Sequence, residues 1–131
     1  MLTSNKNTVA FSMPGGETCS TARGRPFDLV HLARTTLGDR GLEREVLQLF
    51  DRQSTLLIAR MRAAAPAGMA TLAHTLKGSA RGIGAWRVAR AAEALELAGP
   101  SGPDAVAGAL DQLTAAADEA RAVIAELLLP N

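Results

Sequence analysis

The sequence is short of the residues from which metal and disulfide sites are built. Its 131 residues include one cysteine, Cys19, and two histidines, His31 and His74. A single cysteine cannot form a disulfide within the chain, and no Glu-x-x-His or His-x-x-x-His pair is present. We therefore expect no metal site, and we assign no chemistry to Cys19 or His31.

An excess of one charge and a long apolar run are also absent. The net charge is +1, and aromatic residues make up 3% of the chain. A nucleic-acid-binding domain is expected to carry a strongly basic face. No apolar run approaches the ~20 residues needed to cross a bilayer, and the N-terminus lacks the apolar core of a secretory signal. We expect a soluble, cytoplasmic protein that binds neither nucleic acid nor membrane.

Apolar residues are plentiful, at 47% of the chain. Alanine and leucine dominate them, which favours helices over strands, and the length fits one domain. Residues 1–25 are rich in Ser, Thr, Asn and Gly and show no periodicity. They are predicted to form a flexible tail, which leaves residues 26–131 for the folded domain.

Apolar periodicity and helix-breaking residues predict an all-α fold. The helices are expected at 27–37, 39–64, 67–84, 85–98 and 103–128. Ser101 and Asp104 are expected to form a capping box before the last one. In the helix at 39–64 the pattern places one set of residues on the buried stripe: Leu42, Val46, Leu49, Phe50, Gln53, Leu56, Leu57 and Ala64. A second set lies on its flank and either meets the short first helix, widens the core or forms a receiver-docking surface: Leu47, Ile58 and Met61.

Residues 70–85 carry the strongest functional pattern. His74 is two residues from both Leu72 and Leu76, which is roughly 200° around a helix, so it points away from their buried stripe. A glycine inside a helix costs roughly 1 kcal/mol relative to alanine, yet Gly78 lies one turn after His74 and opens space beside the ring. Lys77 brings a positive charge to that space. An exposed histidine nitrogen can be a covalent nucleophile, and lysine can neutralise phosphoryl oxygens.

The motif His74-Thr-Leu-Lys77-Gly78-Ser79, followed by Gly84-Ala85, resembles the signature of histidine-containing phosphotransfer (HPt) domains. The resemblance covers residues 26–128 and is specific in 70–98. It implies an antiparallel up-down four-helix bundle with a short extra N-terminal helix. It also implies that His74 accepts a phosphoryl group from a receiver-domain aspartate or a hybrid histidine kinase and passes it to another receiver domain.

The same resemblance implies roles for residues around His74. Lys77 would steady the phosphoryl group, and Arg81 is a further candidate by position. Glu96 lies where many family members have Gln or Glu, and it would accept a hydrogen bond from the ring nitrogen that is not phosphorylated. Without the resemblance it would be a solvated surface residue. The residues that would leave space for a docking partner are Gly78, Ser79 and Thr71.

The chain contains no glycine-rich phosphate loop, no ATP-binding signature and no carboxylate cluster for Mg²⁺. We therefore expect a monomeric, non-enzymatic phosphocarrier without its own cofactor, with Mg²⁺ held by the receiver partner. Two alternatives remain: the phosphoacceptor domain of a chemotaxis-type histidine kinase, and a helical adaptor that is never phosphorylated. The high Ala and Arg content suggests a bacterial source.

Overall fold

A computed structural model describes residues 26–130, and these residues form helices joined by short turns. The helices are α2 (Leu29–Thr35), α3 (Arg40–Ala63), α4 (Pro66–Ile83), α5 (Trp86–Glu96) and α6 (Pro103–Leu127), with a 3₁₀ turn η1 (Gly99–Ser101) before α6. The all-α prediction is confirmed, and each helix lies within a few residues of its predicted bounds. The tail predicted for residues 1–25, including Cys19, lies outside the described residues.

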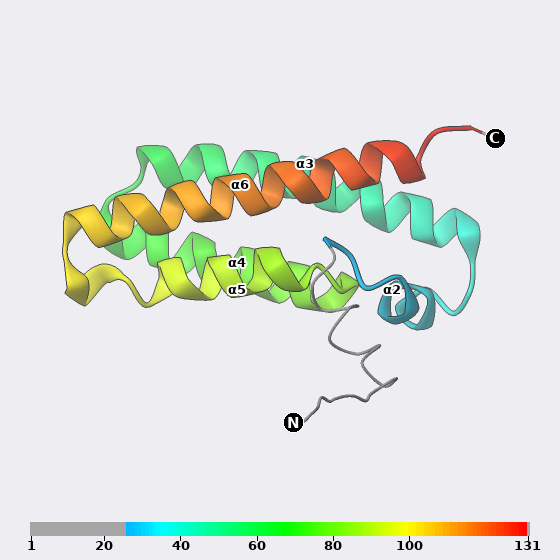
Figure 1. The fold of residues 1–131 in the computed structure, drawn as a ribbon, viewed down its shortest axis with the longest axis horizontal. Helices are drawn as coiled ribbons and strands as arrows, with labels where there is room; N and C mark the ends of the chain where they lie inside the picture. Colours follow the sequence, from blue (N-terminus) through cyan, green and yellow to red (C-terminus); the bar gives the residue numbers. More distant parts are fainter. Residues whose placement is uncertain (1–25, 131) are drawn as a thin grey trace, which may run out of the picture.

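The four long helices form an antiparallel bundle (Figure 1). Helices α3 and α6 lie in one layer and α4 and α5 in the other, and each consecutive pair is in contact, as are α3 and α6. The short α2 lies at one end of the bundle and packs against α4. This is the predicted up-down arrangement with an extra N-terminal helix.

The ends of the helices follow from local chemistry, with one departure from prediction. Asp39 caps α3 by accepting a hydrogen bond from the Leu42 backbone N–H at 3.0 Å. The capping box at Ser101 and Asp104 is wrong, because Ser101 belongs to η1 and the residue before α6 is Gly102. Gly102 has a φ of 100°, and Pro103 follows at the first helical position, where it has no N–H to be capped.

The buried face of α3 differs from the predicted one. Leu47, Phe50, Ser54, Leu57, Ile58 and Met61 are buried, whereas Leu42, Leu49 and Leu56 are 41%, 59% and 51% exposed. The three flank residues therefore belong to the core, together with Phe50 and Leu57 of the predicted stripe, and a docking surface made of the flank is ruled out. The buried Ser54 hydroxyl donates to the Asp51 carbonyl at 3.1 Å, which satisfies its hydrogen bonding.

Helices α4 and α6 also turn apolar residues inward, and of the stripe predicted for α4, Leu76 is buried and Leu72 is half-buried. Leu76 and Ile83 of α4 are buried, as are Leu113 and Ile124 of α6. Alanines fill much of the remaining interior, and those that are buried are Ala73, Ala80, Ala89, Ala92, Ala117 and Ala120. Small side chains let neighbouring helices approach closely, so α4 and α5 can bring their outward-facing residues into contact.

Helix α2 is fixed to the turn between α4 and α5. The Asp28 backbone N–H donates to the Gly84 carbonyl at 2.9 Å, and Trp86 Nε1–H donates to the Asp28 carboxylate at 3.1 Å. That bond holds the pKa of Asp28 below its ordinary value, against the opposing effect of burial. Gly84 has a φ of 82°, and a Cβ there would lie 2.9 Å from the Asp28 carbonyl oxygen. The turn after α4 therefore requires glycine.

Candidate functional site

His74 lies on the outward face of α4, with its side chain 66% exposed. Its neighbours Ala73 and Leu76 are fully buried. Because these two residues face the core, the geometry of the helix directs the His74 ring toward the solvent. The ring is thus accessible to a second protein.

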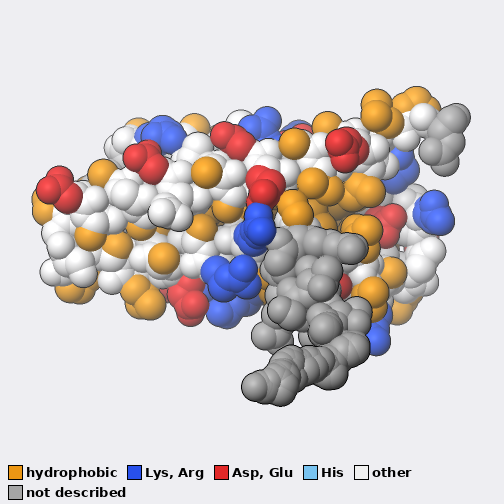
Figure 2. All heavy atoms as spheres, in the orientation of Figure 1, with side chains coloured by type: hydrophobic (Ala, Val, Ile, Leu, Met, Phe, Trp, Pro, Cys, Tyr) orange, Lys and Arg blue, Asp and Glu red, His pale blue; other side chains and the backbone are white. Residues whose placement is uncertain are grey.

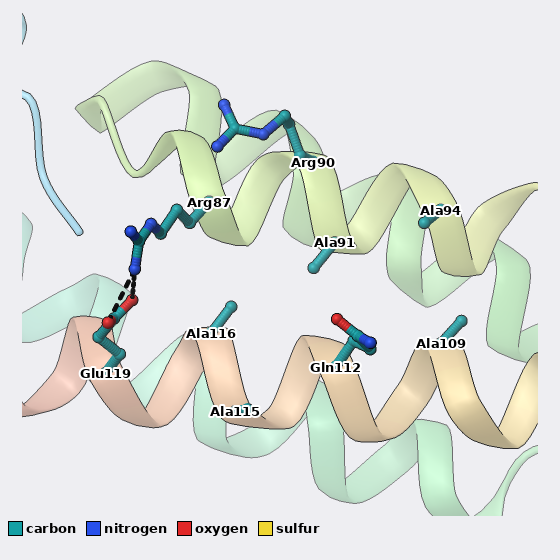
Figure 3. Close-up of a pocket in the computed structure, with 9 residues that line it drawn as sticks. All are labelled: Arg87, Arg90, Ala91, Ala94, Ala109, Gln112, Ala115, Ala116 and Glu119. Carbon is teal, nitrogen blue, oxygen red and sulfur yellow. Dashed lines mark hydrogen bonds and ion pairs between the residues drawn. The ribbon is translucent and has the colours of Figure 1, made fainter. Parts of the chain in front are cut away.

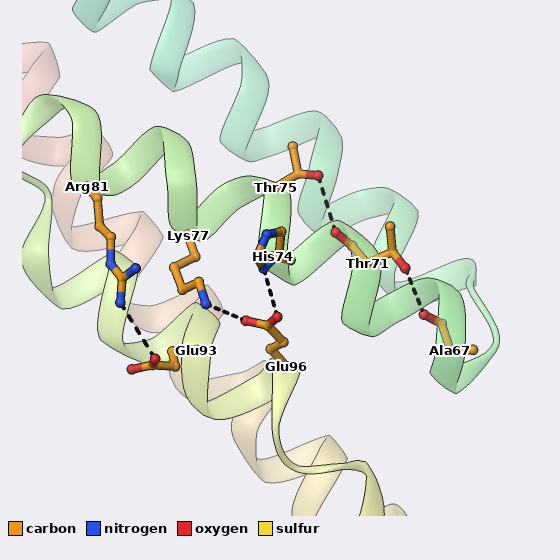
Figure 4. A network of polar contacts seen from close by, with 8 residues as sticks. All are labelled: Ala67, Thr71, His74, Thr75, Lys77, Arg81, Glu93 and Glu96. Atoms are coloured by element: carbon orange, nitrogen blue, oxygen red, sulfur yellow. Dashed lines mark hydrogen bonds and ion pairs between the residues drawn. The ribbon is translucent and has the colours of Figure 1, made fainter.

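One ring nitrogen of His74 is held by Glu96, the last residue of α5. The distance between His74 Nδ1 and Glu96 Oε2 is 2.8 Å (Figure 4). The pKa of Glu96 lies below its ordinary value, chiefly because Lys77 donates a hydrogen bond to it, against some desolvation, and then because of the bond from His74. An ionised carboxylate only accepts hydrogen bonds. Nδ1 therefore carries the proton, and in the neutral ring Nε2 keeps its lone pair.

Lys77 belongs to the same network. Its Nζ donates to the other oxygen of Glu96, Oε1, at 2.7 Å, and its side chain is 13% exposed. The carboxylate thus bridges the ring and the ammonium group (Figure 4). The contact between His74 and Glu96 expected from the resemblance is present. The pairing of Lys77 with Glu96 was not anticipated, because it joins residues 19 apart on different helices.

Three small residues lie near His74 on α4, and packing within the described part of the chain does not require glycine at position 78. A Cβ added to Gly78 would meet no atom within 4 Å, so open space lies beside this residue. Thr71 is exposed, and its hydroxyl donates back to the Ala67 carbonyl at 3.2 Å. Ser79 is half-buried. The surface of α4 around His74 therefore carries short side chains that leave space beside the ring.

The comparison with protein families agrees with this geometry. The family described as Hpt domain matches residues 45–123, more than half of the chain. The chain belongs to the Hpt domain family. No curated protein and no solved structure matches it. An Hpt domain has a phosphotransfer role in phosphorelay signalling, and its partners are receiver domains or kinases.

The Hpt match includes His74, Lys77 and Glu96 and leaves out α2. Arg81, the further phosphoryl-binding candidate, lies two turns after His74 on α4. Its guanidinium forms an ion pair with Glu93 of α5 at 3.6 Å, and both side chains are about half exposed. The Arg81–Glu93 pair lies beside the Lys77–Glu96 pair, and both connect α4 to α5 (Figure 4). Arg81 is not bonded to His74, Lys77 or Glu96.

Two further hollows among the described residues are lined by no Ser, Thr, Cys, Lys or His side chain. A groove of about 560 Å³ lies between α5 and α6, lined mainly by alanines, and the Arg87 and Glu119 side chains pair across it at 2.8 Å (Figure 3). A hollow of about 240 Å³ lies between α4 and α5, beside Arg81, Trp86 and Arg90. On the face drawn in Figure 2, acidic and basic side chains are interspersed with apolar ones.

Metal sites and membrane spans can be assessed over residues 26–130. Within that range, no group of three or more His, Cys, Asp and Glu side chains could hold a metal ion. No helix in the same range is long and apolar enough to cross a membrane.

Proposed function

We propose that this Hpt domain is a phosphocarrier in a two-component phosphorelay, a phosphoprotein in which His74 is the phosphorylated residue. Its phosphoryl group would come from a receiver-domain aspartate or a hybrid histidine kinase and would pass to the aspartate of another receiver. The observation that supports this is the exposed ring whose Nδ1–H donates to Glu96, because that bond leaves Nε2 as the nucleophile facing the solvent.

In the proposed step, the lone pair of Nε2 attacks the phosphorus of the aspartyl phosphate. The Nε2–P bond forms while the bond between phosphorus and the aspartate oxygen breaks, and the aspartate leaves as a carboxylate. The ring keeps its Nδ1 proton and becomes positively charged. Glu96 stabilises that charge through the existing hydrogen bond, so no proton has to leave. Transfer to the next receiver is the reverse of this step.

Lys77 is proposed to neutralise the phosphoryl oxygens. Its ammonium group and the ring share the Glu96 carboxylate, so it is already beside the site where negative charge arrives. Arg81 is the further candidate, two turns along α4, and it would exchange its ion pair with Glu93 for the phosphoryl oxygens. Positioning and charge neutralisation are the main contributions that a protein makes to phosphoryl transfer.

The remaining machinery is proposed to come from the partner. The receiver would hold Mg²⁺ and bring its aspartate to Nε2. The short side chains of Gly78, Ser79 and Thr71 would leave room for it on the surface of α4. The chain would then act as a carrier without catalytic apparatus of its own. We place this relay in the cytoplasm of a bacterium.

The proposal is tested by following phosphate on the protein. Wild type and His74→Gln are each incubated with phosphorylated receiver domains from the source organism, and acid-labile phosphate on the chain is measured. Wild type is expected to become labelled and His74→Gln is not, with an unchanged helical circular dichroism spectrum. His31→Gln serves as the matched control and should be labelled like wild type. If His74→Gln were labelled, His74 would not be the phosphorylated residue.

Chemical phosphorylation gives a second, partner-free measurement. Phosphoramidate donates its phosphoryl group directly to accessible histidine nitrogens, and ³¹P NMR of the product distinguishes substitution at Nε2 from substitution at Nδ1. We expect the Nε2 product, because Nδ1 is bonded to Glu96. An adaptor that is never phosphorylated would instead keep all its functions in the His74→Gln variant.

A further inference from the structure

Helix α3 carries a line of exposed leucines that nothing in the described chain covers. Leu42, Leu49 and Leu56 are 41%, 59% and 51% exposed. Residues seven apart lie almost two full turns apart, so these three form one row about 21 Å long. Large exposed apolar patches on a single protein mark interaction surfaces. We refer to these three residues as the leucine row.

The contacts of α3 define where the leucine row faces. The core side of α3 is formed by residues such as Leu47 and Ile58. Its contacts with α6 come from Asp51, which pairs with Arg121, and from Arg62, which donates to Thr114. On a helical wheel the leucine row is roughly 130° from the centre of the core face and 150° from the α6 contacts. It therefore faces away from both the core and α6.

Two charged residues beside the leucine row would pair with each other between two copies of α3 that lie antiparallel. Glu45 and Arg52 are both exposed and lie on one side of it. If two copies of α3 pair antiparallel about Leu49, then Leu42 meets Leu56 and Leu49 meets its own counterpart. Glu45 of each copy then faces Arg52 of the other. Parallel pairing would instead place Glu45 and Arg52 of one copy on the opposite side of the interface from Glu45 and Arg52 of the other, so neither ion pair would form.

We propose that two copies of this chain associate through the leucine rows of their α3 helices, packed antiparallel about Leu49. The sequence led us to expect a monomer, but it also placed these leucines in the core. Three half-exposed leucines supply less than the roughly 800 Å² per partner of a standard interface. The dimer should therefore be weak and depend on concentration. His74 lies on α4, outside the leucine row, so the inference stands or falls independently of the phosphocarrier proposal.

The first test measures the mass of the full chain in solution. Sedimentation velocity from about 10 μM to about 1 mM should show a shift from monomer to dimer. Leu49→Lys places a charge at the centre of the interface and should raise the dissociation constant roughly tenfold or more. Leu97→Lys, at an exposed leucine outside α3, is the matched control and should dimerise like wild type. A wild-type chain that stays monomeric over the whole range would overturn the proposal.

The second test determines the orientation of the two helices. Cysteines are introduced singly into the Cys19→Ser chain and oxidised. Leu49→Cys should form a disulfide with itself. Leu42→Cys alone and Leu56→Cys alone should not, because their counterparts lie about 21 Å apart in the antiparallel pair. A mixture of these two should form the mixed disulfide. Self-linking of both single variants would indicate parallel pairing and refute the arrangement.

A third result would assign the leucine row to a different occupant. If wild type and Leu49→Lys were both monomeric, but Leu49→Lys slowed phosphotransfer from a receiver, then a receiver would cover the row and the dimer would be wrong. Normal labelling by phosphoramidate in that variant would show that His74 itself was unaffected. Conversely, loss of labelling in His74→Gln with dimerisation intact would support both proposals.

Discussion

Replacing Gly78 by leucine should change stability and phosphotransfer in opposite directions. Gly78 lies inside α4, it is exposed, and a Cβ there would meet no atom within 4 Å. Leucine should therefore fit without strain and remove the helix penalty of glycine, which stabilises the domain by about 0.5–1 kcal/mol. For a domain of this size that corresponds to a rise in Tm of roughly 2 to 5 °C.

The same side chain occupies the space beside His74 through which a receiver would approach. Displacing reacting groups by about 1 Å can reduce the rate about 100-fold, so kcat/KM for transfer from a phosphorylated receiver should fall about 10- to 100-fold. Gly78→Ala should give a smaller decrease. Labelling by phosphoramidate should change much less, because a small donor needs less room. The assays are thermal unfolding followed by circular dichroism, and a time course of phosphotransfer.

Gly108 provides the matched control. It lies inside α6 and is also exposed, and a Cβ added to it would likewise meet no atom within 4 Å. Gly108→Leu should raise Tm by a similar amount and leave phosphotransfer unchanged. The reasoning fails if Gly78→Leu transfers as fast as wild type, or if Gly108→Leu slows transfer equally.

Three further predictions concern the network around His74 and the contact of α2. Glu96→Gln leaves one amide oxygen for two donors, so the yield of phosphohistidine from phosphoramidate should fall on the order of tenfold, measured by ³¹P NMR. Lys77→Ala should slow the accumulation of phosphohistidine or shorten its lifetime, and an unchanged time course would contradict its role. The pKa of Asp28 is lowered from 3.8, so its stabilisation is present above about pH 4 and lost as the pH falls through the lower folded value. Asp28→Ala should cost about 1 kcal/mol at neutral pH and weaken this acid dependence, followed by the fluorescence of Trp86, the one tryptophan.

The bounds of the helices could be predicted from the sequence because the signals are local. Gly38, Pro66 and Gly84 lie at the turns between helices, and the structure places helix ends beside each of them. The outward position of His74 followed from its spacing to Leu72 and Leu76. These inferences needed only the geometry of one helix.

The inward face of α3 could not be predicted in the same way. Its apolar residues form two overlapping rows, one with Leu42 and Leu49 and one with Leu47 and Met61. Periodicity cannot decide between two such rows, since the choice depends on where α4 and α6 pack. The hydrogen bond from Lys77 to Glu96 could not be predicted for a similar reason. It depends on how α4 and α5 pack against each other.

The attachment of α2 bears on where the Hpt domain can be cut. The family match begins at residue 45, but Phe27 packs edge-on against Phe50 with ring centroids 6.1 Å apart. A fragment starting at the family boundary would uncover Phe50 and remove the hydrogen-bond acceptor of Trp86. Expression fragments and domain fusions of this protein should therefore keep every residue from Pro26 onward, even though the family match starts later.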